Sequence, residues 1–283
     1  MLTLSEVKEW RSYANEVREK GRIVGLVPTM GALHEGHVAL FREAKDRGDV
    51  VVATIFVNPR QFDDVGDLER YPRTLEHDRA LARGGGVDCL IEPALDAMWP
   101  DYPALTPTTV SVGGLGERFE GAGRPGHFDG VASVVAKLFA ITGPSRAYFG
   151  EKDFQQLAVV RQMVHDIAFD VEVVGCAIVR DHDGLAFSSR NARLSTNGRR
   201  HALALSKALA LVAQRDDSAS AQRALMTTTL LDAGVDVAYA DVVNPETLVP
   251  SRDDETGERR ALVAGLVEGV RLLDNGPVRI VGK

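Results

Sequence analysis

Two histidines, His34 and His37, stand three residues apart after an apolar run and a turn, and they are the residues best placed to do chemistry. The apolar run at residues 23–27 predicts a strand, and the residues after the pair predict a helix. A helix N-terminus presents unpaired N–H groups and a partial positive charge, which favour a bound phosphate. Gly31 and Gly36 let the backbone approach that phosphate closely. Protonated imidazoles would offset the charge that builds up when an α-phosphate is attacked, so we expect adenylate chemistry.

The His-x-x-His spacing is also compatible with two different roles. Histidines near a turn are commonly surface residues, and such a pair is also half of a metal site. The strand, glycine and helix around the pair are the setting that a phosphate site requires. The motif alone does not distinguish a phosphate site from a metal site or from two surface residues, and the other motifs of the chain are needed to do so.

A pair of amides follows the second predicted strand, residues 50–57. Pro59 ends that strand, so we expect Asn58 and Gln61 at its carboxyl end, where an open α/β sheet binds its ligands. Carboxamides donate and accept hydrogen bonds, which suits a substrate with hydroxyl and carboxylate groups. An ordinary Asn-Pro turn beside an exposed glutamine accounts for the pattern equally well on local grounds.

A third segment, residues 149–156, combines the end of another predicted strand with the start of a helix. Gly150 permits a tight turn, Lys152 brings a positive charge toward phosphates, and Asp153 is an acceptable N-cap. Gln156 is expected on an apolar helix face, where a bound substrate would give its amide partners. That face would consist of Val160, Met163 and Ile167. The alternative is that Lys152 is an ordinary surface lysine.

The fourth segment contains two adjacent hydroxyls and a guanidinium, Ser188, Ser189 and Arg190. Placed between two domains, these groups could clamp a triphosphate, because arginine forms charge-assisted hydrogen bonds to phosphate. By itself Ser-Ser-Arg is a weak pattern, and it is equally compatible with an ordinary interdomain loop.

The elements that position these residues follow an α/β pattern over the first 180 residues. Short β-branched runs alternate with segments of helical character, which predicts a Rossmann-like, doubly wound parallel sheet. The expected strands are residues 23–27, 50–57, 89–91, 147–149 and 171–179. The expected helices are residues 5–20, 37–47, 68–83, 130–142 and 153–168. We expect glycines to end three of these helices, at Gly48, Gly143 and residues 84–86.

The pattern changes after Val179, where we expect a smaller α+β domain. Two helices at residues 195–213 and 218–234 precede strands at residues 237–243 and 261–267. The domains expected from this change are residues 1–179 and residues 180–283.

Composition excludes several classes of function. The 283 residues are 45% hydrophobic and 26% charged, which is ordinary for a globular enzyme. A net charge of −7 without a long basic run argues against a nucleic-acid partner. Neither a membrane span nor a signal peptide is expected from the distribution of apolar residues. Cys89 and Cys176 lie in apolar runs without a C-x-x-C motif, which predicts small buried residues and a reducing, cytoplasmic location.

Together these segments resemble the pantothenate synthetase family, the pantoate–β-alanine ligases, over nearly the whole chain. The blocks that carry the resemblance are residues 28–37, 56–59 with 61–62, 124–128, 149–156 and 188–191. The resemblance implies a nucleotidyltransferase-type Rossmann domain that binds ATP and pantoate, a smaller domain that covers the site, and a homodimer. The implied reaction uses ATP and Mg²⁺, joins pantoate to β-alanine through a pantoyl adenylate, and releases AMP and pyrophosphate. No prosthetic group is implied.

The resemblance also implies a role for each matching residue. The implied ATP-binding positions are Met30, Gly31, Ala32, Leu33, His34, Glu35, Gly36, His37, Gly150, Glu151, Lys152, Asp153, Val179, Phe187, Ser188, Ser189 and Arg190. The implied catalytic residues are His37, His34, Lys152 and Arg190, and Tyr71, Val134 and Val135 match an apolar pantoate pocket. Pantoate would be held by Gln61 and Gln156, with Gln61 also near β-alanine and Asn58 in the same site. The sequence has no Cys/His cluster, which favours a metal ion carried by ATP over one held by the protein.

Three positions depart from the family pattern. Phe187 stands where the family usually has methionine, Arg60 replaces a common apolar residue, and Asp129 occupies a position that is often basic or small. None of these changes removes a catalytic group. Residues 63–68 vary most freely beside the site, and we expect them to form a mobile lid.

Two other functions are compatible with parts of this pattern. A nucleotidyltransferase that transfers AMP or CMP to a phosphorylated acceptor would share the His-x-Gly-His element, but the glutamines favour an uncharged, hydroxylated acceptor. A nucleotide-binding regulatory module without catalysis is the other candidate. Binding alone rarely needs as many charges on one phosphate as His37, Lys152 and Arg190 provide.

Overall fold

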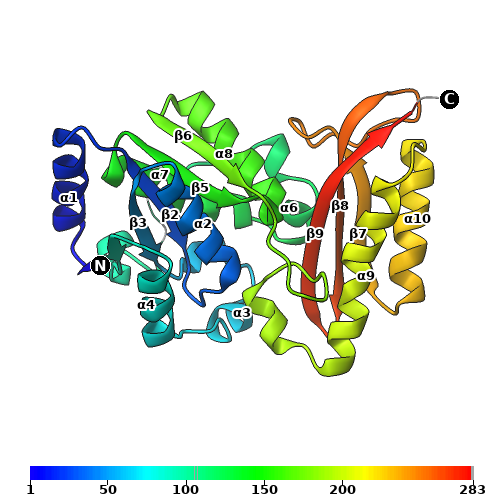
Figure 1. The fold of residues 1–283 in the computed structure, drawn as a ribbon, viewed down its shortest axis with the longest axis horizontal. Helices are drawn as coiled ribbons and strands as arrows, with labels where there is room; N and C mark the ends of the chain where they lie inside the picture. The colour runs from blue at the N-terminus through cyan, green and yellow to red at the C-terminus, as the bar shows by residue number, and fades with distance from the viewer. Residues whose placement is uncertain (105, 107, 282–283) are drawn as a thin grey trace. The chain divides into compact units, whose positions relative to one another are not determined.

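The computed structural model describes residues 1–104, 106 and 108–281. The chain divides into two compact units, Met1–Glu151 with Gln155–Ala177, and Lys152–Phe154 with Ile178–Lys283. The second unit therefore includes a short segment that lies in sequence between the two parts of the first. In Figure 1 the first unit is drawn mainly in blue, cyan and green, and the second mainly in yellow-green to red.

The first unit is built on a parallel sheet in which the structure describes six strands, in the order β1-β4-β3-β2-β5-β6. The strands are β1 (Leu2–Leu4), β2 (Val24–Thr29), β3 (Val50–Ile55), β4 (Cys89–Ile91), β5 (Ser145–Gly150) and β6 (Val171–Cys176). From β2 the chain adds β3 and β4 on one side, then returns to add β5 and β6 on the other. The topological switch point lies between β2 and β5, and the predicted doubly wound sheet is confirmed.

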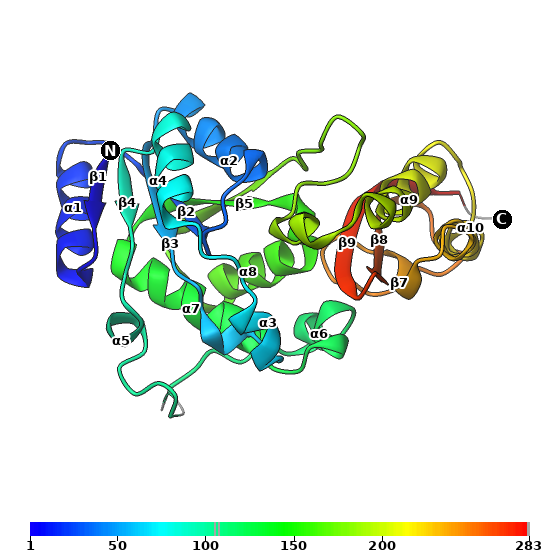
Figure 2. The same ribbon diagram turned by 90° about the horizontal axis from the view of Figure 1, so that it is seen from below.

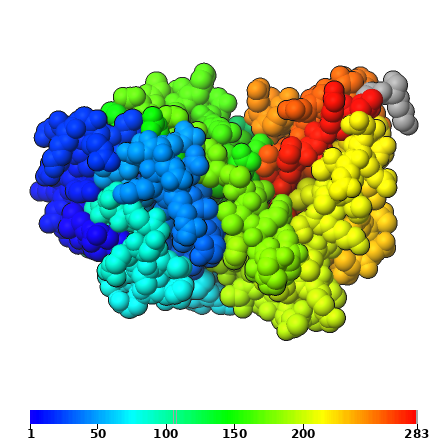
Figure 3. All heavy atoms as spheres, in the orientation of Figure 1, coloured from blue at the N-terminus to red at the C-terminus, as the bar shows by residue number. Residues whose placement is uncertain are grey.

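Helices cover both faces of this sheet, because alternate side chains of each strand point to opposite sides. On one face α2 (Glu35–Asp46) and α4 (Leu75–Gly84) pack on strand residues such as Val51 and Leu90. These two helices lie side by side, drawn in blue and cyan in Figures 2 and 3.

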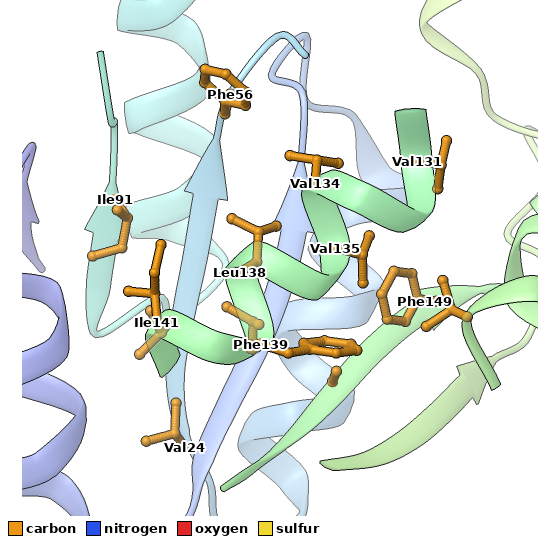
Figure 4. Close-up of a cluster of buried hydrophobic side chains, with 14 of the residues drawn as sticks. Val24, Phe56, Ile91, Val131, Val134, Val135, Leu138, Phe139, Ile141 and Phe149 are labelled. Atoms are coloured by element: carbon orange, nitrogen blue, oxygen red, sulfur yellow. The ribbon is translucent and has the colours of Figure 1, made fainter. Parts of the chain in front are cut away.

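The other face packs against α1 (Val7–Glu19), α7 (His127–Thr142) and α8 (Phe154–Ile167). Figure 4 shows apolar side chains of α7 directed at the strands that carry Val24 and Ile91. Helix α7 is apolar around most of its circumference, which is typical of a helix that is buried on several sides. It begins at His127, directly after Gly126, and the carbonyl of Gly130 near its start accepts a hydrogen bond from Asn58, one of the expected site residues.

The predicted helix ends are confirmed at the glycines. Gly48 and Gly143, with φ values of 80° and 74°, follow α2 and α7 in the backbone conformation that glycine adopts most easily. Helix α4 ends at Gly84, and the amide of Val87 bonds back to the Ala82 carbonyl at 3.0 Å.

The single helix predicted at residues 68–83 is wrong. The structure has two helices there, α3 (Val65–Glu69) and α4, with Pro72 between them. Proline disfavours helical backbone at the preceding residue and cannot donate a hydrogen bond within a helix. Strand β1 was not predicted, because its three residues are too few to show a period. Short turns complete the unit: α5 (Leu95–Met98), α6 (Glu120–Gly123), and the 3-10 turns Pro59–Gln61 and Gly114–Gly116. A further 3-10 turn, Glu151–Asp153, begins in the first unit and continues into the second.

The second unit is an antiparallel sheet of β7 (Asp236–Val243), β8 (Gly257–Val267) and β9 (Val270–Ile280). Helices α9 (Thr196–Ala213) and α10 (Ala219–Asp232) pack on one face and share an apolar core with it (Figure 2). A 3-10 turn, Ser189–Arg193, precedes α9. Strand β9 was not predicted, because the polar residues Asp274 and Asn275 followed by Gly276 and Pro277 interrupt its apolar alternation. The predicted α+β character is confirmed.

Candidate active site

The predicted site residues of the first unit follow three adjacent strands. Residues 30–37 follow β2, and Asn58 and Gln61 follow β3. Gly150 is the last residue of β5, and Glu151 begins the turn that leads to α8. Strands β3, β2 and β5 are neighbours in a parallel sheet, so their carboxyl ends lie along one edge. An open α/β sheet binds ligands outside this edge, at the switch point between β2 and β5.

The loop between β2 and α2 is held by a buried carboxylate. Asp78, 1% exposed in the first turn of α4, accepts the backbone N–H of Ala32 at 3.0 Å and that of Leu33 at 2.8 Å. Thr74 Oγ1 donates to the same carboxylate at 3.1 Å. Gly31 and Ala32 have φ values of 80° and 50°, a conformation that the two hydrogen bonds help to maintain. Sequence reasoning missed Asp78, since nothing near it in the chain points to the distant loop.

The side chains of both histidines accept backbone N–H groups at the N-terminus of α2. His34 is the N-cap residue of α2, and its Nδ1 accepts the amide of Gly36 at 3.1 Å. Nδ1 of His37 accepts the amide of His34 at 3.3 Å, and the two ring centroids are 4.2 Å apart. A nitrogen that accepts a hydrogen bond carries no proton, so each ring is neutral and protonated at Nε2.

This geometry corrects the expectation that protonated imidazoles offset the developing charge. An imidazolium has a proton on both nitrogens and could not accept the amide of Gly36 or His34 at Nδ1. The arrangement instead gives two neutral rings whose Nε2–H groups are hydrogen-bond donors. Both lie at the N-terminus of a helix, where an oxyanion is stabilised.

Asn58 and Gln61 are buried, 1% and 8% exposed, at the turn that follows β3. Asn58 Oδ1 accepts the indole N–H of Trp99 at 3.0 Å and the amide of Arg60 at 3.3 Å. Its Nδ2 donates to the Gly130 carbonyl at 3.1 Å and to Gln61 Oε1 at 3.0 Å. The interpretation of Gln61 as an exposed glutamine is therefore excluded, and the amide of Asn58 is fully used within the protein.

The main-chain oxygen of Gln61 is held from the other side by α7 and the turn before it. His127 Nδ1 lies 2.7 Å from this oxygen, and Arg124 Nη2 donates to it at 3.2 Å. Because the carbonyl only accepts, Nδ1 of His127 carries the proton, and Nε2 accepts from Arg124 Nη1 at 3.1 Å. Burial, and next the charge of Arg124, lower the pKa of His127 to about 4. Arg124 in turn pairs with Asp63 at 3.0 Å.

Two adjacent glutamines at the start of α8 have different surroundings. Gln155 is 6% exposed, and its amide bonds to the backbone of Leu115, Arg118 and Glu120 at 2.8 to 3.0 Å. Gln156, predicted as a substrate ligand, is only partly buried, and its side chain makes no hydrogen bond within the described part of the chain. The apolar face expected around it is correct for Val160 and Met163 but wrong for Ile167, which is 49% exposed. Ile167 is the last residue of α8, where the helix extends beyond the core.

In the second unit, the backbone of Lys152 is held by a hydrogen bond from strand β9. Its carbonyl accepts Nδ2 of Asn275 at 2.8 Å, and Asn275 Oδ1 accepts Nε of Arg260 at 2.7 Å. The guanidinium of Arg260 lies 4.4 Å from the ring centroid of Phe154. The Lys152 ammonium lies 3.4 Å from Asp153 Oδ1. Strand β9 thus sets the backbone of the segment that carries Lys152.

The other predicted residues of the second unit form a short hairpin and a turn. The amide of Phe187 bonds to the Val179 carbonyl at 3.0 Å, and Ser188 Oγ accepts the amide of Arg190 at 3.3 Å. Arg180 anchors the hairpin through a bidentate pair with Asp274 at 2.6 and 3.0 Å. Asp274 is 3% exposed and was missed by sequence reasoning, since its strand was not predicted.

Two departures from the family pattern have structural partners. Arg60 Nη2 donates to the Ala104 carbonyl at 2.7 Å, and its guanidinium lies 5.0 Å from the Trp99 ring centroid. Asp129 Oδ1 accepts the amide of Val112 at 2.7 Å, so it tethers the segment before α6 to α7. Of the predicted apolar lining, Val134 and Val135 are buried on α7, and the ring of Tyr71 packs edge-on against Phe62 at 5.7 Å between centroids.

Both cysteines are buried and free, as predicted for Cys89 and Cys176. Burial raises the pKa of each thiol to about 12. Across residues 1–104, 106 and 108–281, no group of three or more His, Cys, Asp or Glu side chains is arranged to hold a metal ion. Within the same residues, none of the helices is long and apolar enough to span a membrane.

The comparisons with known proteins agree over nearly the full chain. The family model described as pantoate-beta-alanine ligase matches residues 2–277. The pantothenate synthetase of Cereibacter sphaeroides is 49% identical over 279 residues, which cover 97% of this chain and 99% of that protein.

Two solved structures have the same fold. Pantothenate synthetase from Thermus thermophilus matches with a TM-score of 0.89 at 46% identity, over 98% of this chain and 99% of that one. The pantoate-beta-alanine ligase of Francisella tularensis, complexed with beta-gamma ATP and beta-alanine, matches with a TM-score of 0.80 at 32% identity. That match covers 98% of this chain and 97% of the other.

Proposed function

Since the chain belongs to the pantoate–β-alanine ligase family and condenses pantoate with β-alanine in an ATP-dependent reaction, we propose that the chemistry takes place at the switch point between β2 and β5. The observation that carries this placement is the histidine pair at the N-terminus of α2. Its two Nε2–H groups are donors at the end of a helix that favours negative charge.

ATP is proposed to bind along residues 30–37, with its phosphates at the N-terminus of α2. Gly150 to Asp153, Val179 and residues 187–190 would complete the nucleotide site, with Lys152 and Arg190 on the phosphates. A helix N-terminus with glycines before it suits a phosphate, and two cations suit a triphosphate. Mg²⁺ would enter with ATP as part of the substrate, where it lowers the charge of the phosphates.

The first step forms a mixed anhydride. A carboxylate oxygen of pantoate attacks the α-phosphorus of ATP in line with the bond that breaks, and pyrophosphate leaves with that bond's electron pair. The nucleophile and the phosphate are both anionic, so their repulsion has to be offset before they approach. Lys152 and Arg190 would contribute positive charge, and His34 and His37 would donate hydrogen bonds from Nε2 to oxygens whose charge increases.

Pantoate is proposed to bind through Gln61 and Gln156. Gln61 is buried beside the switch point, and Gln156 has an amide that no other described group uses. The ring of Tyr71 and the side chains of Val134 and Val135 would pack against the apolar part of pantoate. Gln61 would also lie near β-alanine.

The second step joins the acyl group to β-alanine. The neutral amine attacks the carbonyl carbon of pantoyl adenylate, AMP leaves with the electron pair of the broken bond, and the nitrogen loses a proton. Acyl adenylates hydrolyse in water, so the site has to exclude water until the amine arrives. We propose that residues 63–68 supply part of this cover.

The assembly and location are also proposals. The family resemblance suggests a homodimer. Free buried cysteines suit a reducing cytoplasm, where disulfides do not persist.

The experiment that tests this function is isotope exchange between pyrophosphate and ATP in the purified protein. We expect exchange with pantoate and Mg-ATP in the absence of β-alanine, because the adenylate forms reversibly before the amine is used. Addition of β-alanine should then yield pantothenate and AMP together. Exchange that strictly requires β-alanine would exclude the stepwise reaction, and AMP transfer to a phosphorylated acceptor instead would favour a nucleotidyltransferase.

A further inference from the structure

The carboxamide of Asn58 has an orientation that its partners determine without ambiguity. The indole of Trp99 and the amide of Arg60 can only donate, so the atom 3.0 and 3.3 Å from them is the oxygen. The Gly130 carbonyl can only accept, so the atom 3.1 Å from it is the nitrogen. With its carboxamide flipped, Asn58 would turn its NH2 group toward two donors and its oxygen toward an acceptor.

The orientation of Asn58 determines that of Gln61. Asn58 Nδ2 lies 3.0 Å from the Gln61 side chain and only donates, so the facing atom is Oε1. Within the described part of the chain, Gln61 Nε2 has no hydrogen-bond acceptor. Gln61 therefore presents a group with two N–H donors to a ligand, and its Oε1 is turned toward Asn58, from which it accepts a hydrogen bond.

We propose that Trp99 is a positioning residue for substrate binding, which acts through Asn58 to hold Gln61 as a hydrogen-bond donor. The Gln61 position then recognises a carboxylate or hydroxyl oxygen and disfavours a donor such as an ammonium group. Asn58 acts through Gln61 and does not itself contact the substrate. This inference rests on the proposed contact between Gln61 and pantoate.

The surroundings of Trp99 hold its indole in place. The ring is 5% exposed, and the cationic groups of Arg60 and Lys137 each lie 5.0 Å from its centroid, within range of cation–π attraction. Gly130 lets α7 approach the 59–61 turn, because a Cβ there would collide with the Arg60 carbonyl. Two elements far apart in the sequence thus fix the Asn58 amide from either side.

The test compares two tryptophan variants. Trp99→Phe keeps an aromatic ring and removes the indole N–H that Asn58 accepts, together with part of the ring's volume, a loss that the Trp10 control shares. We expect the KM for pantoate to rise about fivefold, as for the loss of one buried hydrogen bond, with the KM for ATP changed less than about twofold. Trp10→Phe is the matched control. Trp10 is buried in the same apolar core, and its indole nitrogen has no partner among the described residues, so its removal should leave both KM values unchanged.

A double-mutant cycle separates positioning from a general structural role. In a Gln61→Leu background there is no amide to orient, so Trp99→Phe should not raise the pantoate KM further. An equal rise in both backgrounds, or no rise in the single variant, would overturn the inference while the parent enzyme remains active. A parent without pantoate-dependent pyrophosphate exchange would overturn the proposed contact and this inference together.

Asn58→Asp provides a second variant in case Trp99→Phe is poorly folded. A carboxylate still accepts from Trp99 and Arg60 but cannot donate to Gln61, which should turn so that its carbonyl faces the ligand. We expect the pantoate KM to rise about tenfold or more in protein whose thermal melting remains cooperative. An unchanged pantoate KM in folded Asn58→Asp protein would overturn the inference.

Discussion

Oδ1 of Asp78 lies 2.8 Å from the amide nitrogen of Leu33 and links the first turn of α4 to the loop before the histidine pair. The second oxygen of the same carboxylate accepts the amide of Ala32 at 3.0 Å. A buried carboxylate that accepts two backbone N–H groups holds the loop in one conformation. The conformation of residues proposed to bind ATP therefore depends on a helix that carries none of the predicted ligands.

We expect Asp78→Asn to weaken ATP binding more than pantoate binding. Asparagine keeps the volume but turns an NH2 group toward one of the two amides, which leaves a buried N–H without an acceptor. Such a group costs about 1–3 kcal/mol, so we expect a loss of that size in the free energy of unfolding. The ATP KM should rise about tenfold, because the loop is no longer held in one conformation.

Denaturant unfolding and steady-state kinetics of the variant would measure both effects. Glu76→Gln is the control on the same helix, since the Glu76 side chain is 86% exposed and pairs at the surface. Equal effects on the KM values for ATP and pantoate would show that Asp78 supports the fold without a selective role in the loop.

A second prediction concerns the pH dependence of stability. Burial and Arg124 lower the pKa of His127 to about 4 in the folded protein, against 6.5 for a free histidine. Between these values the unfolded chain binds a proton that the folded protein does not, so stability is full above about pH 6.5 and decreases as the pH falls toward 4. We expect His127 to contribute a loss of about 2 kcal/mol between about pH 6.5 and about pH 5.

His127→Gln should remove this loss. Glutamine can donate to the Gln61 carbonyl and accept from Arg124, as His127 does, but it does not titrate. Unfolding free energies over about pH 5 to 7.5 should therefore vary less in the variant than in the parent. His165→Gln is the control, because the His165 side chain is 83% exposed. A variant with the same pH profile as the parent would contradict the assignment.

The sequence predicts those parts of the site that are local in the chain. The strand, glycines and histidines of residues 23–37 are contiguous, so their pattern indicates a helix N-terminus at a strand end. The doubly wound sheet is predictable for the same reason, since buried parallel strands are short apolar runs at regular spacing. Gln61 and Asn58 could be placed at a strand end, but the sequence could not reveal which groups their amides contact.

The groups that hold the site in place are distant in sequence, and no local pattern identifies them. Asp78 and Leu33 are 45 residues apart, Trp99 and Asn58 are 41 apart, and Arg180 and Asp274 are 94 apart. A polar residue within an apolar segment is the one signal that such anchors leave. Asp274 shows that signal. It also prevents the prediction of β9, because a buried charge interrupts the alternation of apolar and polar residues by which strands are recognised.

A third prediction is that neither cysteine reacts in the native protein. Cys89 is fully buried and Cys176 is 9% exposed, and burial raises the pKa of both thiols to about 12. At about pH 8 almost none of either thiol is ionised, and the thiolate is the reactive form. We expect both to resist a chromogenic disulfide reagent in buffer and to react at once in denaturant. Rapid modification of one thiol in the folded enzyme would show that a strand opens locally.

The last prediction concerns the two groups proposed to act on the phosphates, Lys152 and His37. Lys152→Ala removes a cation and His37→Ala removes an Nε2–H donor, so each should lower the rate of adenylate formation about 10²-fold or more. Single-turnover quenching with ATP and pantoate, without β-alanine, measures this step apart from the second one. Lys8→Ala on the exposed side of α1 and His165→Ala on α8 are the controls, and they should retain the parent rate. Equal single-turnover rates in parent and His37→Ala or Lys152→Ala protein would reject the roles proposed for these residues. A similar decrease of the rate in the control variants would show that the loss of activity comes from impaired folding.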